Sequence, residues 1–345
     1  MKLSLVELGT VTPGTDKTTA LRSALDAARQ AEELGYHRIW YTEHHGTPGF
    51  ASHAPELLIA LAARETNRIR VGSGAVLLNH YSPFKVAETF LQLEALAPGR
   101  IDLGLGRATT GPVIDLALRR DRAARPVDDF DGQVQEILAY LHGAFPEEHP
   151  FAQIDVTAGV ATRPDVWVLG SSGSSAHLAG RLGLGYAFAG FINPARAEQA
   201  LLGHRHAFTP TAFGSTDHRA MLAVNVVVAD TDAEAQRLVW PTRALYARLG
   251  RMGPSATVPT VAEAERELSK AEKDAPTVIH GGHWPRQLAG SPEMVREQLQ
   301  LMAAATGAQE IMVQDIIPDP DARAKSRALL ADALGVTPAA ASDRA

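Results

Sequence analysis

A repeat of strand-like and helix-like segments constrains the fold of this chain more than any other feature. Eight short apolar segments of strand character each precede a segment with helical spacing of apolar residues: KLSLVEL, RIWYTEHH, RIRVGSGAVLL, RIDLGLGR, DVWVLG, GYAFAGF, RAMLAVNVVVAD and QEIMVQDII. Alternating strands and helices favour a parallel sheet with helical crossovers. Eight such units predict an α/β fold, a (β/α)8 TIM barrel. An open doubly wound sheet is the alternative, and it would require at least one of the eight strands to be absent.

Two stretches lack the repeat and are expected to be insertions, at about 108–163 after the fourth strand and at 251–290 after the seventh. The first contains a helical pattern over 128–143 that we expect to be the fourth crossover, and we expect Pro241 to kink or interrupt the helix after the seventh strand. Long irregular connections in compact domains are often lids, so we expect 251–290 to cover the catalytic face. We expect residues 1–335 to form one domain and 336–345 a disordered tail.

Composition excludes several classes of protein. The chain of 345 residues has no cysteine, which excludes disulfides, thiolate metal sites and a cysteine nucleophile. Its formal net charge is −6, and acidic and basic residues are interspersed, so the sequence shows no basic segment of the kind that binds nucleic acid. No apolar stretch reaches the roughly 18 residues that span a bilayer, and the N-terminus lacks a signal-peptide pattern. We therefore expect a soluble cytoplasmic protein without membrane or nucleic-acid partners.

Four polar or glycine-rich segments lie where consecutive predicted strands end. They are EHH at 43–45, GSGA at 72–75, Arg107, and SSGSS at 171–175. In a barrel the carboxyl ends of all strands meet at one face, where barrel enzymes carry out their chemistry. These segments are therefore expected to form one continuous wall of an active site.

The EHH segment suggests a metal site, an interpretation that we reject. Neighbouring side chains on a strand point to opposite faces, so two adjacent histidines rarely chelate one ion. No complementary set of metal ligands occurs elsewhere on the predicted face. We expect one of His44 and His45 to face the lumen as an acid or base while the other is held in the wall. The alternative is that both histidines are structural.

The glycine-rich segments each allow two interpretations. SGAV at 73–76 is either a bulge that shapes the barrel or a place where a planar ring lies against the backbone. SSGSS at 171–175 is either a tight turn with a serine N-cap or a phosphate cradle at the start of a helix. Arg107, one strand away, either binds the same phosphate or forms a structural salt bridge.

Three segments in this order resemble the bacterial luciferase-like flavin-dependent monooxygenases: YTEHHG, RIRVGSGAVLLNHYSPFKVAETFLQLEALAPGRIDLGLGR and VLGSSGSSAHLAGRLGLGYAFA. The resemblance covers 3–189 and 291–334, and residue types and spacing match together in the middle segment. It implies an FMN cofactor, used as FMNH2 from a separate NAD(P)H:flavin reductase. It also implies a flavin C4a-peroxide that oxygenates an apolar organic substrate, such as an aldehyde, a ketone or a secondary metabolite. We further expect a homodimer.

The resemblance implies roles for individual residues. His44 corresponds to the catalytic histidine and Glu43 to its neighbour at the flavin site, so both are assigned to catalysis. The Gly74–Ala75 peptide bond corresponds to a cis bond against which the flavin ring lies. The implied cofactor-binding residues are Ser73, Gly74, Ala75, Arg107, Ser171, Ser172, Gly173 and Ser175.

The chain departs from the family pattern in two places. Ser171 stands where the luciferase phosphate turn has a glutamate, and Gly190 with Phe191 replaces a polar residue of close relatives. The reactive flavin requires an apolar pocket closed to water. Candidate lining residues are Leu77, Leu78, Phe191 and Trp284. The histidines outside the EHH segment, such as His204, His206, His280 and His283, are expected to be solvated.

Three functions are compatible with this sequence. The favoured one is an FMN-dependent monooxygenase. The second is an F420-dependent oxidoreductase, which shares the fold but transfers a hydride without oxygen. The third is a non-catalytic flavin-binding subunit, against which His44 and the full count of barrel strands argue.

Overall fold

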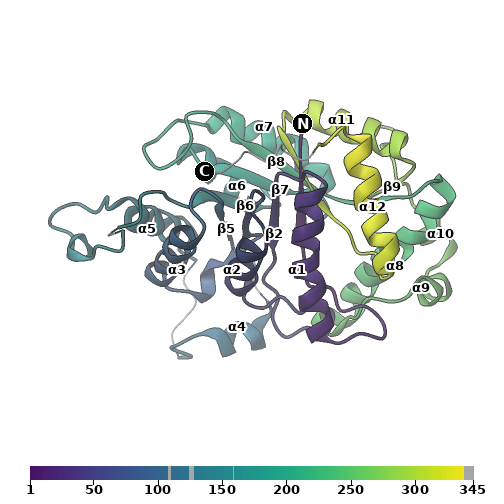
Figure 1. Cartoon of the computed structure of the whole chain (residues 1–345), viewed down its shortest axis with the longest axis horizontal. Coiled ribbons are helices and arrows are strands. Elements are labelled where there is room, and N and C mark those ends of the chain that lie inside the picture. Colours follow the sequence, from purple (N-terminus) through teal and green to yellow (C-terminus); the bar gives the residue numbers. More distant parts are fainter. Residues whose placement is uncertain (108–109, 124–127, 158, 338–345) are drawn as a thin grey trace.

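Eight parallel strands close into a barrel, because β10 pairs with both β1 and β8 (Figure 1). The computed structural model describes residues 1–107, 110–123, 128–157 and 159–337. The barrel strands are, in order around the barrel, β1 Lys2–Glu7, β2 Arg38–Tyr41, β3 Arg70–Ser73, β5 Ile101–Gly106, β6 Asp165–Gly170, β7 Gly185–Ala189, β8 Ala220–Val228 and β10 Glu310–Gln314. Each corresponds to one predicted strand, so the (β/α)8 barrel is confirmed and the open sheet is excluded.

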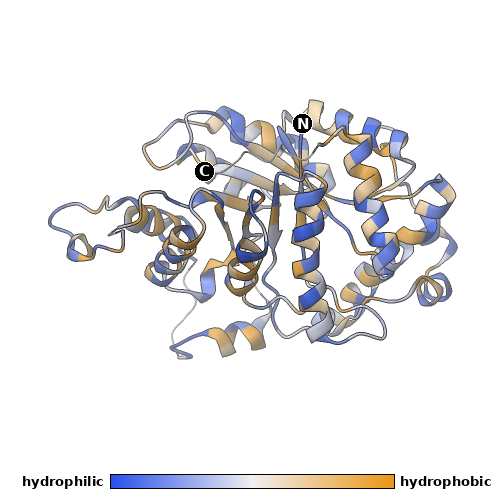
Figure 2. Ribbon diagram, viewed as in Figure 1, coloured by the Kyte–Doolittle hydropathy of each residue, from blue (hydrophilic) through white to orange (hydrophobic). Residues whose placement is uncertain are grey.

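A ring of helices covers the outside of the barrel. Its members are α1 Lys17–Glu33, α2 Pro55–Glu65, α3 Pro83–Leu96, α5 Phe130–His142, α6 Gly173–Arg181, α7 Ala197–Ala207, α11 Pro292–Thr306 and α12 Pro320–Ala333. The strands are mostly apolar, whereas the helices alternate apolar and hydrophilic residues (Figure 2). The apolar residues of the helices that are buried pack on the strands in one core. None of the helices in the described residues is long and apolar enough to cross a membrane.

The lumen of the barrel is filled by apolar side chains and, at its amino-terminal end, by buried ions. Trp40 and Trp167 pack edge to face, with ring centroids 5.6 Å apart. Below them Arg38, which is 3% exposed, lies 2.8 Å from Asp102 Oδ2 through Nη1 and 2.8 Å from Glu310 Oε1 through Nε. Side chains therefore close the end of the barrel opposite to the carboxyl ends of the strands.

The second insertion differs from its prediction. Helix α8 Asp232–Met252 continues through Pro241, so Pro241 does not interrupt it, and the kink stays a prediction. The crossover after β8 is α11, which packs between α7 and α12, whereas α8 contacts the insertion. The stretch predicted to be irregular contains α9 Val261–Glu267, α10 Lys270–Lys273 and a ninth parallel strand, β9 Gln287–Gly290. The insertion therefore starts at the end of β8 and includes α8.

Smaller differences concern the strand ends and the first insertion. Strand β2 stops at Tyr41, so EHH follows the strand instead of lying on it. The third predicted strand is divided at Gly74–Ala75, and its second part, β4 Val76–Leu77, pairs with β5. The first insertion contains α4 Pro112–Leu118. Most of the predicted tail, 338–345, and part of the first insertion lie outside the described residues.

Candidate active site

A cavity of about 620 Å³ opens at the carboxyl ends of the barrel strands. All four predicted wall segments contribute to its lining. The predicted site residues that line it are Glu43, His44, Gly74, Ala75, Arg107, Ser171, Ser172 and Ser175. Ser73 and Gly173 do not. Ser73 is fully buried, and its hydroxyl joins β3 to β5 by bonds of 2.9 Å to the carbonyl and the amide of Gly104.

His44 faces this cavity as a neutral imidazole. Burial is the main cause that lowers the pKa of His44 to about 4, and the neighbouring His45 and His53 lower it further. Its Nδ1 lies 2.9 Å from Thr42 Oγ1, and its ring packs on Phe50 with centroids 4.8 Å apart. Because Nδ1 is occupied, Nε2 is the nitrogen available to a bound molecule. The Thr42 hydroxyl can donate or accept, so it permits either tautomer.

Glu43 holds the wall together. Its carboxylate is 4% exposed and accepts hydrogen bonds from Tyr81 Oη at 2.8 Å, from His45 Nε2 at 2.7 Å and from the Leu77 amide at 3.0 Å. A carboxylate with its oxygens occupied in this way is poorly placed to exchange protons with a substrate. Glu43 therefore positions its neighbours, and His45 is the histidine that is held in the wall.

The backbone after β3 offers a flat surface to the cavity. The peptide bond between Gly74 and Ala75 is cis, as the family resemblance implied. The Gly74 amide donates to the Tyr41 carbonyl at 2.8 Å, which fixes the segment to β2. A Cβ at Gly74 would lie 3.1 Å from the Trp40 Cβ, so the lumen packing leaves little room for a side chain at this position. The backbone itself forms this part of the wall.

Two strands further around the barrel, the wall is formed by the start of α6. Ser172 is its N-cap residue, and the Ser172 side chain makes no capping hydrogen bond. The Ser172 carbonyl holds the turn, because it accepts hydrogen bonds from Tyr186 Oη at 2.9 Å and from Ser175 Oγ at 3.1 Å. The Ser175 hydroxyl also fills the space where a Cβ at Gly170 would lie. The first amides of α6 are therefore available to an anion.

Arg107 stands at the edge of the same cavity. Its Nη1 lies 3.1 Å from Asp128 Oδ2, and the side chains of the two residues are 51% and 67% exposed. A surface pair of this kind contributes little to stability. Arg107 is therefore free to turn toward an anion at the start of α6.

The remaining lining is mostly apolar. Of the predicted lining residues, Leu77 and Phe191 contribute to it. Leu78 lies in the core, and Trp284 is partly buried and packs against that core. The insertion contributes Leu249 from α8 and Pro254 from the turn that follows α8. Part of the predicted lid thus forms a wall of the cavity.

Sequence reasoning missed several residues of the site. Thr42, Phe50 and Gln314 line the cavity, and the hydroxyl of Tyr81 binds Glu43. Thr42 directly precedes EHH, so its proximity was visible, whereas the others approach only in the folded chain. The described residues contain no group of three or more histidine, cysteine, aspartate or glutamate side chains that could hold a metal ion.

The prediction that the other histidines are solvated was wrong for His204. This residue is fully buried on α7, and its Nε2 lies 3.0 Å from the Leu184 carbonyl. Burial, then the neighbouring His218, lowers the pKa of His204 to about 4. The polar residues around it in the sequence concealed its inward orientation.

Comparison with known proteins gives consistent matches. A sequence model described as luciferase-like monooxygenase matches residues 1–310. Protein YceB of Bacillus subtilis (strain 168) is 39% identical over 330 residues, which cover 96% of this chain and 98% of that relative. The luciferase-like monooxygenase of Escherichia coli (strain K12) is 34% identical over 329 residues, 95% of this chain and 96% of that protein. The N-acetyl-S-alkylcysteine monooxygenase of B. subtilis is 31% identical over 334 residues, 97% and 98% of the two chains.

Solved structures share the architecture. The crystal structure of apo-MsnO8 is 40% identical, has a TM-score of 0.88 and covers 98% of both chains. The oxygenating constituent of 3,6-diketocamphane monooxygenase from Pseudomonas putida, solved in complex with FMN, has a TM-score of 0.68 at 24% identity and covers 96% of both chains. The F420-dependent tetrahydromethanopterin reductase of Methanopyrus kandleri has a TM-score of 0.66 at 16% identity, over 96% and 98% of the two chains. The latter two likenesses concern the fold alone.

Proposed function

This chain belongs to the luciferase-like monooxygenase family and is a monooxygenase, and from this premise we propose that it uses reduced FMN and dioxygen to oxygenate an apolar organic substrate. The observation that carries the proposal is the single cavity at the mouth of the barrel. It brings together a neutral histidine, a flat backbone segment and an open helix N-terminus.

The cavity fits FMN at both ends. The uncapped start of α6, with Ser171, Ser172 and Ser175, suits a phosphate because backbone amides and the helix dipole attract anions. Arg107 can add a charge-assisted hydrogen bond. The Gly74–Ala75 segment, which presents no large side chain, suits a planar ring. A volume of about 620 Å³ lies within the usual range for cofactor sites.

Reduced FMN would supply the electrons that activate dioxygen. The protein supplies binding, exclusion of water and proton handling. His44 is neutral and offers Nε2, so it can accept a proton from the substrate or form a hydrogen bond to it. Leu77, Phe191 and Leu249 give the cavity an apolar surface, which keeps water from the reacting atoms.

Reconstitution tests the proposal. The purified protein is mixed anaerobically with FMNH2 and then with oxygen, in the presence of a long-chain aldehyde, a cyclic ketone or an N-acetyl-S-alkylcysteine. The thioether is included because one relative is named for that substrate. We expect incorporation of one atom of ¹⁸O from ¹⁸O₂ into one of these products. Oxygen-independent turnover with reduced F420 would instead identify a hydride-transfer enzyme, and flavin binding without turnover of any substrate would identify a non-catalytic subunit.

We also propose that a separate NAD(P)H:flavin reductase supplies the FMNH2 and that the chain forms a homodimer. Adding NAD(P)H and oxidised FMN without a reductase should give no product, whereas adding a general flavin reductase should restore it. Light scattering of the purified protein measures its assembly state directly.

A further inference from the structure

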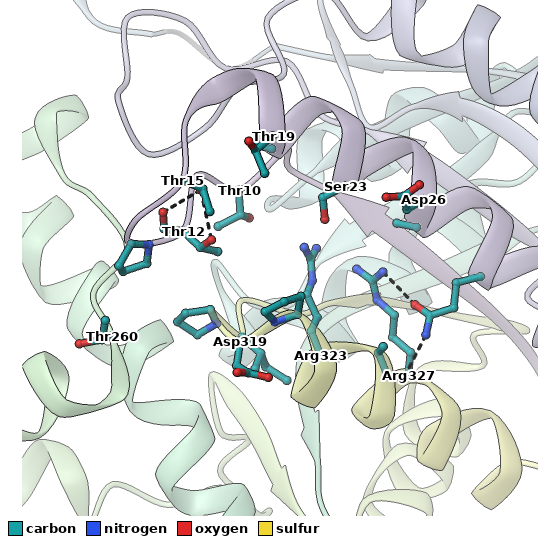
Figure 3. A pocket seen from close by; sticks show the side chains of 18 of the residues that line it. Thr10, Thr12, Thr15, Thr19, Ser23, Asp26, Thr260, Asp319, Arg323 and Arg327 are labelled. Atoms are coloured by element: carbon teal, nitrogen blue, oxygen red, sulfur yellow. Dashed lines mark hydrogen bonds between the residues drawn. The ribbon is translucent and has the colours of Figure 1, made fainter.

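A second cavity of about 750 Å³ lies outside the barrel, between α1 and α12. Its upper wall is formed by the loop between β1 and α1 and by the first turns of α1, and its floor by α12, as Figure 3 shows. It shares no lining residue with the cavity that contains His44. The cavity is large enough for a small organic molecule.

The floor of this cavity offers an unused hydrogen-bond donor. Arg323 is 7% exposed, and its guanidinium rises from α12 toward Ser23 on α1 (Figure 3). Its Nε lies 2.8 Å from Asp315 Oδ1 and its Nη2 lies 2.6 Å from Glu7 Oε2. Nη1 bonds to none of the described residues, which leaves one fixed donor that faces the cavity. Ser23 Oγ likewise has no partner among those residues and lies across from it.

The charges around the cavity disfavour an anionic ligand. Arg323 and Arg327 are both paired with Glu7 and Asp315, and Asp26 and Asp319 add two further carboxylates to the lining. A phosphate or carboxylate ligand would add a buried charge that nothing compensates, which is costly. A carbonyl or hydroxyl oxygen can accept from Arg323 Nη1 without this cost.

We infer that the cavity between α1 and α12 is a second ligand-binding site for a neutral small molecule that combines a carbonyl or hydroxyl oxygen with an apolar body. The oxygen accepts from Arg323 Nη1, and a hydroxyl group of the ligand forms a hydrogen bond with Ser23 Oγ. Apolar residues of the two helices, such as Ala20 and Ala27 on α1, contact the body of the ligand. This inference is independent of the proposed function.

Ligand-observed NMR and calorimetry test it with three neutral probes: 4-hydroxybenzamide, benzamide and benzyl alcohol. The matched anion is 4-hydroxybenzoate, which differs from the first probe only in its carboxylate. We expect at least one neutral probe to bind more tightly than about 10 mM and 4-hydroxybenzoate to bind at least about tenfold more weakly than its amide. Absence of binding by all three neutral probes, or a preference for the carboxylate, would overturn the inference.

Variants assign the binding to this cavity. Ser23→Phe fills the space without removing a hydrogen bond to the protein and should reduce affinity by about tenfold or more. Arg22→Phe, at an exposed neighbouring position of α1, is the matched control and should bind normally. Ser23→Ala removes only the hydroxyl, so it should fold normally and weaken binding by about threefold to tenfold through one lost hydrogen bond. If both Ser23→Phe and Ser23→Ala bind the probe as wild type does, the probe lies elsewhere and the site does not exist.

Discussion

At the scale of single residues, the protonation state of His44 determines what it can do. Its pKa of about 4 keeps the imidazole neutral throughout the physiological range. It can therefore accept a proton or share one in a hydrogen bond, whereas a role as a general acid from the resting state would require prior protonation. Position in the cavity and charge state together make it a base or a hydrogen-bond partner.

We predict that His44→Ala binds FMN normally but loses about 10²–10⁴ in the rate of substrate oxygenation, the usual contribution of general acid–base help. Oxidation of FMNH2 should continue and release hydrogen peroxide. The measurement is product formed per FMNH2 oxidised. His45→Ala is the control, because it removes a bond to Glu43 and should lower the melting temperature more than the coupling. Unchanged coupling in His44→Ala would make this imidazole structural.

Arg107→Ala should weaken FMN binding by about 1–2 kcal/mol. This is near the low end for a charged hydrogen bond, because the side chain is half exposed. Asp128→Ala removes its surface partner and should leave the affinity unchanged or raise it. Anaerobic titration of FMNH2 into the three proteins measures both effects. Equal affinity for wild type and Arg107→Ala would remove Arg107 from the phosphate site.

Local patterns in the sequence located the site but left the choice between His44 and His45 open, and only the family resemblance assigned the catalytic role to His44. EHH, SGAV and SSGSS were placed by their positions at strand ends, which depend on local patterns. The choice between His44 and His45 depends on Glu43, Tyr81 and the chain between them, which meet only in the folded protein. His204 was misjudged for the same reason, since its partner is a backbone carbonyl on another segment.

At the scale of elements, the insertion after β8 brings a second layer to the mouth of the barrel. Leu8, Phe50 and Ile316 from the barrel loops pack against Leu245 of α8 and against Ala256 in one apolar cluster. The cluster holds the end of α8 and the turn that follows it beside the cavity. This arrangement explains how a segment distant in sequence supplies part of the cavity wall.

We predict that binding of FMN together with a substrate analogue slows amide hydrogen exchange at 249–256, because a filled cavity restrains its wall. Helix α9, at Val261–Glu267, contributes no residue to the cavity that contains His44, and only Val261 to the cavity between α1 and α12. It is therefore the internal control and should exchange at an unchanged rate. Protection of α9 without protection of 249–256 would show that the insertion does not close over the site.

The sequence predicted the eight barrel units but not the insertion, for identifiable reasons. Helix α8 has the same apolar periodicity as a crossover helix, and only its contacts reveal that it belongs to the insertion. Strand β9 has four residues, QLAG, too few to show a pattern, and it forms only by pairing with the end of β8. Pro241 did not break α8, because the tertiary environment outweighed the local preference.

At the scale of the whole molecule, the buried ions at the amino-terminal end of the barrel couple distant strands. Asp102 accepts from Arg38, from Arg70 and from Trp40 Nε1 at 2.6–2.9 Å. We predict that Asp102→Asn lowers the free energy of unfolding by about 3–5 kcal/mol, because it removes a buried carboxylate that pairs with both Arg38 and Arg70 and leaves Glu310 as the main counter-charge of Arg38. The control Asp131→Asn removes an exposed pair with Arg181 and should change stability by less than about 0.5 kcal/mol. Urea unfolding measures both, and equal effects would contradict a structural role for the network.

Stability should also fall in mild acid. Burial is the main cause that lowers the pKa values of His37, His44 and His204 to about 4, whereas the same residues take up protons near pH 6.5 in the unfolded chain. Between these values the unfolded state binds more protons, so the free energy of unfolding decreases as the pH falls from about 6.5 to about 4. Melting temperatures at pH 7.5, 6 and 5 should decrease in that order. His204→Gln should show a weaker dependence, and an equal slope in both proteins would contradict the assignment.

The two ends of the insertion lie side by side. The Ala229 amide donates to the Gly290 carbonyl at 3.2 Å, and the Ser291 amide donates to Asp232 Oδ1 at 2.6 Å. The chain therefore leaves the barrel and returns to it at one place. The sixty or so residues between form a self-contained insertion, here called a cassette, whose two ends are joined by hydrogen bonds. Such a cassette can be exchanged for that of a relative without altering the strands that fold the barrel. Substrate preference can then diverge by recombination at this junction while the strand ends proposed to hold the flavin are inherited intact.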